Sequence, residues 1–116
     1  MAQYMLSIVY PEGAEAPPED ELAAIMRDAR TVTEQMQDAG VWIFSAGLKP
    51  ASTASVVTAH QDDFVRAADG PYAQTKAQLG GFNLIEVPDE AEARRWAAEI
   101  SRAVRCPVEV RGLVSV

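Results

Sequence analysis

The residues best suited to chemistry in this 116-residue chain lie in one polar, glycine-rich segment. The segment reads Asp-Gly-Pro-Tyr-Ala-Gln-Thr-Lys-Ala-Gln-Leu-Gly-Gly-Phe and occupies residues 69–82. Asp69 opens it, and its carboxylate can act as a general acid or base in a partly apolar cavity. The same carboxylate can instead accept a backbone N–H and fix a turn, because Asp, Gly and Pro are turn-forming residues. Both roles for Asp69 stay open at this point.

The next residues of the segment are candidates for ligand contact. Gly70 and Pro71 shape the turn after Asp69. Tyr72 offers a ring that can close a pocket and a hydroxyl that can donate, although a tyrosine serves equally in interface packing. Thr75 and Lys76 can donate hydrogen bonds to an anion, or can stay solvated as loop residues usually do. The segment is therefore rich in residues that shape a site and poor in reactive ones.

Glycines close the segment at Gly80 and Gly81. Phosphate cradles place glycines directly before a helix start, and no helix start follows here. We therefore expect these glycines, like Gly70, to serve turns with positive φ or close approaches of two backbones.

Three further residues are isolated candidates. His60, the one histidine, lies beside a Gln-Asp-Asp turn and is either an acid–base group or an exposed turn residue. Arg111 can bind a carboxylate if it faces a cavity, or can pair with Glu109 on the same side of a strand. Cys106 has no second cysteine or nearby histidine with which to build a disulfide or a metal site. We expect no metal, no cofactor and no Ser-His-Asp or Cys-His nucleophile set.

Two amphipathic helices must position these residues. The first is predicted over 19–39, between the Pro17-Pro18 pair and Gly40. The second is predicted to begin at Asp89 as N-cap, with Glu92 three residues on, and to run to about residue 104. Apolar residues recur at helical spacing in both: Leu22, Ile25, Met26, Ala29, Val32, Met36 and Ala39, then Ala93, Trp96, Ala97, Ile100 and Val104.

Extended segments surround the helices. They are predicted at 4–10, 41–46, 54–59, 64–67, 81–87 and 108–114. The order matches an α+β, ferredoxin-like split βαβ fold, with both helices on one face of an antiparallel sheet and a hairpin near residue 62 inserted in its middle. The other face must meet solvent or a partner. The pattern leaves open which face carries Glu109 and Arg111.

The segment at 69–82 resembles the DGPF-type branch of the YCII-related proteins. In that branch an Asp-Gly-Pro-aromatic motif precedes a Thr-Lys step, a Leu-Gly-Gly-aromatic entry to a strand and an Ile-Glu-Val ending, and all of these occur here up to residue 88. The resemblance extends to Tyr-Met-Leu at 4–6, Gly-Leu-Lys-Pro at 47–50 and Val-Glu-Val-Arg at 108–111. It covers nearly the whole chain and implies one YCII/DGPF-like domain over residues 1–116.

The resemblance implies a ferredoxin-like subunit that pairs sheet to sheet as a homodimeric α/β barrel. It implies much less about activity, because most members are uncharacterised and only a His–Asp pair has been proposed as acid–base machinery in the YCII branch. Asp69 matches the Asp of that pair by motif. The His does not carry over, because the histidine of this chain is His60.

The composition of the chain limits which classes of partner are expected. A net charge of -7 and a pI near 4.6 would repel a phosphate backbone, so nucleic acid is not expected as a partner. No basic leader and no apolar run near the ~18 residues of a membrane span is evident, and one cysteine fits a reducing, cytoplasmic setting. Alanines make up 20 of the hydrophobic residues, so the core is thin and help from a partner subunit is expected.

Three functions compete at this stage. The first is a dimeric small-molecule-binding or accessory protein with a pocket near the Asp-Gly-Pro-Tyr motif. The second is a cofactor-independent isomerase or lyase that uses Asp69 as acid or base. The third is a regulatory protein partner, because relatives with this motif are sometimes linked to transcription initiation factors. Binding ranks first, because the motif lacks reactive side chains.

Overall fold

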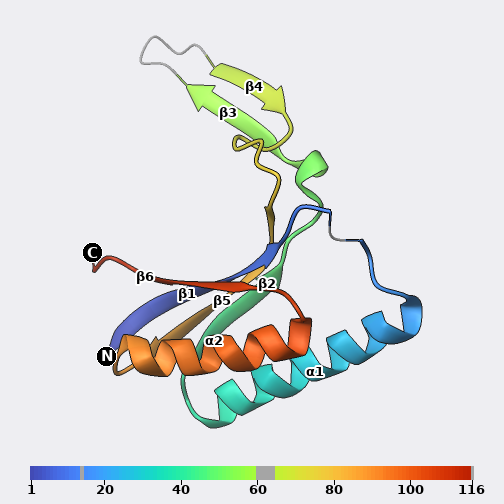
Figure 1. Cartoon of the computed structure of the whole chain (residues 1–116). Coiled ribbons are helices and arrows are strands. Elements are labelled where there is room, and N and C mark those ends of the chain that lie inside the picture. Colours follow the sequence, from blue (N-terminus) through green and yellow to red (C-terminus); the bar gives the residue numbers. More distant parts are fainter. Residues whose placement is uncertain (14, 60–64, 116) are drawn as a thin grey trace.

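The computed structural model describes residues 1–13, 15–59 and 65–115 (Figure 1). Helix α1 spans Glu19–Asp38 and helix α2 spans Glu90–Val104. The Asp89 carboxylate accepts a hydrogen bond from the Glu92 backbone N–H at 3.0 Å, which confirms the predicted N-cap. Gly40, with φ of +73°, follows the end of α1. Among the described residues, no helix is long and apolar enough to cross a membrane.

Four antiparallel strands form the main sheet in the order β2-β5-β1-β6 (Figure 1). Strand β1 spans Ala2–Tyr10, β2 spans Trp42–Gly47, β5 spans Gln78–Val87 and β6 spans Val108–Gly112. Both helices lie against the same face of this sheet (Figure 1). The strand order and the helix placement confirm the α+β, ferredoxin-like fold class.

The core lies between the sheet and the helices. Leu6 of β1 stands opposite Asn83 of β5 and Val110 of β6, so these three side chains share the face that the helices cover. The buried hydrophobic residues are Leu6, Val32, Met36, Ile85, Val87, Ala93, Trp96, Ala97, Ile100 and Ala103. Most of the helical ones belong to α2, which packs against β6, β1 and β5.

The side chains that alternate with the core set lie on the opposite face, which neither helix covers and which we call the open face. It carries Met5 and Ser7 of β1, Phe44 and Ala46 of β2, Phe82, Leu84 and Glu86 of β5, and Glu109 and Arg111 of β6. The Phe44 and Phe82 rings are 6.2 Å apart between centroids, and Phe44 is 51% exposed. The register thus places Glu109 and Arg111 on the open face, a point that the sequence pattern left undecided.

Helix α1 is only half packed. The predicted apolar stripe runs along its whole length, and its second half is buried at Val32 and Met36. In the first half, Leu22 is 44% and Met26 is 58% exposed, because this end of α1 extends beyond the edge of the sheet (Figure 1). The apolar stripe of α1 is therefore buried only in its second half.

A hairpin stands apart from the main sheet. Strands β3 (Ser55–Ala59) and β4 (Val65–Asp69) form their own two-stranded sheet after the short 3-10 helix η1 (Ala51–Thr53), and we call β3 and β4 the arm. The arm rises on the side of the sheet opposite the helices (Figure 1). It raises the radius of gyration to 16.4 Å, against about 13 Å for a compact domain of this length. The inserted hairpin is confirmed.

Candidate functional site

A cleft opens between the unpacked half of α1 and the end of the sheet. It has an inner part, which we call the inner lobe, of about 530 Å³, and an adjoining outer lobe of about 890 Å³. Ile8, Tyr10, Ile25, Leu48 and Val104 line both lobes, so the two spaces are continuous. Both volumes fall in the range of small-molecule sites, roughly 300–1,000 Å³.

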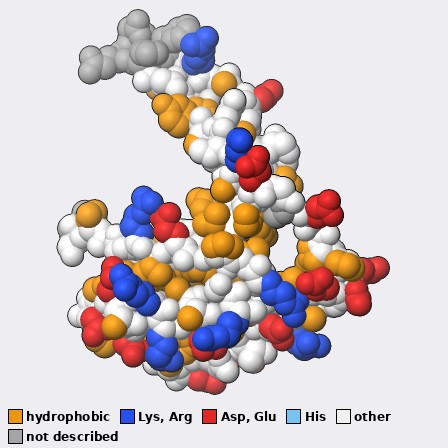
Figure 2. Space-filling view, in the orientation of Figure 1, with side chains coloured by type: hydrophobic (Ala, Val, Ile, Leu, Met, Phe, Trp, Pro, Cys, Tyr) orange, Lys and Arg blue, Asp and Glu red, His pale blue; other side chains and the backbone are white. Residues whose placement is uncertain are grey.

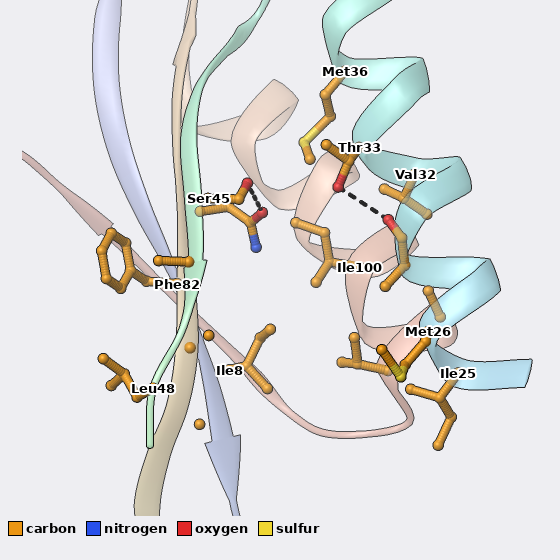
Figure 3. Close-up of a pocket in the computed structure, with 18 of the residues that line it drawn as sticks. Ile8, Ile25, Met26, Val32, Thr33, Met36, Ser45, Leu48, Phe82 and Ile100 are labelled. Carbon is orange, nitrogen blue, oxygen red and sulfur yellow. Dashed lines mark hydrogen bonds between the residues drawn. The ribbon is translucent and has the colours of Figure 1, made fainter. Parts of the chain in front are cut away.

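The inner lobe is walled mainly by apolar side chains (Figure 3). Helix α1 contributes one wall, α2 a second and the helix-facing side of β2 and β5 the floor. Its polar side chains include Thr33, Ser45 and Asn83. Thr33 is already satisfied, because its hydroxyl donates to the Ala29 carbonyl at 3.0 Å. The other apolar lining residues include Met26, Val32, Met36, Ile100 and Ala103.

A short hydrogen-bond chain forms the polar part of the floor. The Trp42 indole Nε1–H donates to Ser45 Oγ at 2.7 Å, and the Ser45 hydroxyl donates to Asn83 Oδ1. The three side chains meet because Trp42 and Ser45 lie close together on β2 and Ser45 pairs with Asn83 across β2 and β5. Asn83 is only 6% exposed, so its side chain is held in one orientation beneath the lobe.

The outer lobe lies where the segment at 69–82 enters β5. Its wall includes Lys76, Gln78 and Leu79 of that segment, together with Lys49 after β2. The chain has two lysines in all, and both line this lobe. Lys76 Nζ lies 3.5 Å from Glu12 Oε1, with both side chains largely exposed, so this ion pair is weak and open to exchange with a ligand.

Two other groups border the outer lobe. Cys106 is partly buried, and this burial raises the pKa of its thiol above the ordinary value, which keeps the sulfur neutral near pH 7. Arg105 reaches from the end of α2 toward α1, with guanidinium nitrogens 3.8 Å from Glu21 Oε1 and from Asp28 Oδ2. These exposed contacts link the two helices at the mouth of the cleft.

The motif residues that precede Lys76 lie elsewhere, at the base of the arm. Asp69 is the last residue of β4, exposed and opposite Ser55. The Gly70 N–H, at a φ of +94°, donates to the Ala54 carbonyl at 2.7 Å, so backbone atoms close this turn. Tyr72 is 89% exposed. None of these residues, nor Pro71, is part of the wall of either lobe.

The rest of the segment is held locally. The Thr75 hydroxyl donates to the Ala77 carbonyl at 2.6 Å, and Gln78 Nε2 donates to the Thr75 carbonyl at 2.6 Å. Gly81 has no room for a side chain, because an added Cβ would lie 2.8 Å from the Ala46 carbonyl oxygen of β2. At Gly80 the same Cβ would lie 2.3 Å from the Tyr10 ring. The predicted close approach of two backbones is therefore confirmed at Gly81, whereas the neighbour of Gly80 is the Tyr10 side chain.

The remaining candidates do not join the cleft. Arg111 forms an ion pair with Glu109 at 2.6 Å on the open face, as one of its two predicted roles required. His60 lies outside the described residues. Within residues 1–13, 15–59 and 65–115, no group of three or more His, Cys, Asp or Glu side chains is arranged to hold a metal.

The sequence matches the YCII-related domain family over residues 2–114. This chain belongs to the YCII-related family. It is also 38% identical, over 85 residues, to an uncharacterised protein of Rhizobium meliloti (strain 1021). That match covers 73% of this chain and 66% of the relative, which is just under two thirds of the relative's length.

The family assignment explains the motif but not the cleft. In this YCII-related chain, sequence reasoning named Lys76 as a candidate ligand contact, and Lys76 lines the outer lobe. It missed Lys49 and the Trp42–Ser45–Asn83 chain as site residues. One signal was available: Asn83 alternates with Ile85 and Val87, so a polar side chain shares the core face of β5. The DGPF branch remains a prediction from the motif.

Proposed function

We propose that this YCII-related protein is a homodimer that binds a small anionic molecule in the cleft between α1 and the sheet. The observation that carries the binding proposal is the placement of Lys49 and Lys76. A chain of net charge -7 positions both of its lysines on the wall of one lobe, next to the mainly apolar inner lobe. Two ammonium groups attract a carboxylate or a similar anion, and the apolar inner lobe takes the rest of the molecule.

The open face supports the homodimer. It exposes an aromatic pair with aliphatic neighbours, bordered by the Glu109–Arg111 and Gln3–Glu86 pairs. An apolar centre with a polar rim is typical of protein interfaces. A two-stranded hairpin is marginally stable alone, and Val57 and Val65 of the arm are 63% and 61% exposed. Figure 2 shows hydrophobic side chains gathered where the arm leaves the main body, a surface that a second copy would cover.

Binding is favoured over acid–base catalysis by Asp69. Its carboxylate lies exposed at the end of β4, away from the residues that line either lobe. A general acid or base must come within hydrogen-bond reach of the substrate proton. Asp69 does not meet that requirement for a ligand bound in the cleft, because it is not one of the lining residues.

The test of binding uses 5-phenylpentanoate, a carboxylate on an apolar body, titrated by isothermal calorimetry. We expect Lys49→Gln and Lys76→Gln each to weaken binding by about threefold to tenfold, since each removes one charge that attracts the carboxylate. Arg66→Gln on the arm is the matched control and leaves the affinity unchanged, because Arg66 is exposed in β4 and does not line the cleft. Equal affinity in all four proteins would show that the lysines play no part in binding.

A further inference from the structure

Asn83 is a polar side chain in an otherwise apolar place. It lies on the core face of β5 between Gly81 and Ile85, is 6% exposed and forms part of the floor of the inner lobe. Its Oδ1 accepts a hydrogen bond from Ser45. Among the described residues, the buried side-chain polar atoms without a partner are Ser7 Oγ and Trp96 Nε1, so Asn83 Nδ2 is not sealed in the core and stays accessible from the lobe.

The hydrogen-bond chain uses only one side of this amide. An indole N–H can only donate, so the Ser45 oxygen accepts from Trp42, and the Ser45 proton goes to Asn83 Oδ1. Among the described residues, none accepts a hydrogen bond from Asn83 Nδ2. Asn83 lies on the face of β5 that the helices cover and lines the inner lobe.

A bound water is a poor partner for this donor. An ordered buried water makes about three hydrogen bonds to polar groups. The Thr33 hydroxyl already donates to the backbone of α1 and the Ser45 hydroxyl is used twice. The remaining lining side chains are apolar apart from the Tyr10 hydroxyl. A single acceptor atom carried on an apolar molecule satisfies the amide without needing further polar partners.

We propose that the inner lobe recognises an apolar group bearing a carbonyl oxygen, which accepts a hydrogen bond from Asn83 Nδ2. The ligand class is then an oxo-acid with an apolar body: its carboxylate lies at the lysines and its carbonyl at Asn83. The location of the carboxylate rests on the proposed function, whereas the recognition of the carbonyl rests on the floor of the inner lobe alone. Trp42 and Ser45 are positioning residues, because they act through Asn83.

The experiment compares two probes that differ at one atom group, 5-oxo-5-phenylpentanoate and 5-phenylpentanoate. We expect the wild-type protein to bind the ketone about tenfold more tightly, since the ketone gains a hydrogen bond from Asn83 Nδ2 in a mainly apolar site. In Asn83→Asp the acceptor for Ser45 is kept and the donor is lost, so the preference for the ketone disappears. The ratio of two affinities within one variant is not changed by a general loss of stability. If Asn83→Asp does not fold, Asn83→Leu provides the same ratio.

Methyl NMR locates the probe. The Ile100 methyl lines the inner lobe only and the Leu79 methyls line the outer lobe only, whereas Ile43 lines neither. We expect the ketone to shift Ile100 and to leave Ile43 unchanged. Shifts at Leu79 with none at Ile100, or equal binding of both probes, would overturn the inner-lobe site while leaving the proposed function intact. No binding of either probe would overturn both. If the Ile100 signal shifts when the protein is diluted but not when the ketone is added, a second copy of the chain fills the lobe, and the proposal is contradicted.

Discussion

Replacement of Phe44 by alanine should weaken the homodimer. Phe44 lies on the open face, opposite Leu84 in the β2–β5 pairing, and is 51% exposed in the single chain. A phenylalanine buries about 150–250 Å² when covered, so about 100 Å² of Phe44 is still available to a partner. At about 25 cal/mol per Å² this is worth about 2.5 kcal/mol per side chain.

Symmetry doubles the effect. In a two-fold dimer each substitution occurs on both sides of the same interface, so the upper bound is about 5 kcal/mol. Side-chain ordering and imperfect packing reduce the measured value, because buried area does not convert fully into affinity. If the measured loss of dimerisation free energy is one third of this upper bound, the dissociation constant still rises at least about tenfold. We therefore expect an increase between about tenfold and a few thousandfold.

Sedimentation equilibrium over a range of protein concentrations measures this constant directly. Leu22→Ala is the matched control: Leu22 is 44% exposed, similar to Phe44, but lies on α1 on the opposite side of the sheet. It should leave the dimer unchanged. A Phe44→Ala protein that dissociates within threefold of the wild type, or a Leu22→Ala protein that dissociates equally, would refute the open face as the interface.

Two further predictions concern the cleft walls. Gly81→Ala should destabilise the fold by about 1–3 kcal/mol, because the new Cβ meets the Ala46 carbonyl oxygen and pushes β2 away from β5. Gly47→Ala is the control and should be neutral or slightly stabilising, because a Cβ at Gly47 has open space around it. Thermal unfolding at matched protein concentration measures both. Cys106 should react with iodoacetamide more slowly than free cysteine at pH 8, because its raised pKa lowers the thiolate fraction. The reaction rate should increase as the pH rises through that pKa. A rate at pH 8 equal to that of free cysteine would contradict this prediction.

The sequence was sufficient for the fold because the signals were local. Pro17, Gly40 and Asp89 mark helix ends through backbone chemistry that needs no tertiary partner, and the boundaries of α1 and α2 agree with them within a residue. The strand order follows from the alternation of strands and helices and from the right-handed crossover rule. The arm was visible as two short apolar runs around a polar turn.

The site was not visible in the same way, because it depends on register and on the angle of α1. The apolar stripe at Ile25 and Met26 looks identical to one that packs against a sheet, and only its position beyond the sheet edge turns it into a cleft wall. Asn83 and Ser45 are 38 residues apart and meet only through the β2–β5 register. The motif predicted a site at Asp69 and Tyr72, but these residues lie at the base of the arm, outside the cleft.

The alternation of β5 separates the two proposed roles of the protein. The Phe82 and Leu84 side chains alternate toward the open side, where a second copy would lie, although Phe82 also borders the inner lobe. Asn83 and Ile85 face the helices, where Ile85 joins the core and Asn83 lines the inner lobe. The main-chain pairing of β5 with β1 and β2 holds both sets at once, so a change on one face need not move the other. Dimerisation and ligand binding should therefore be coupled weakly, and a Phe44→Ala monomer should keep the ketone preference that Asn83 sets.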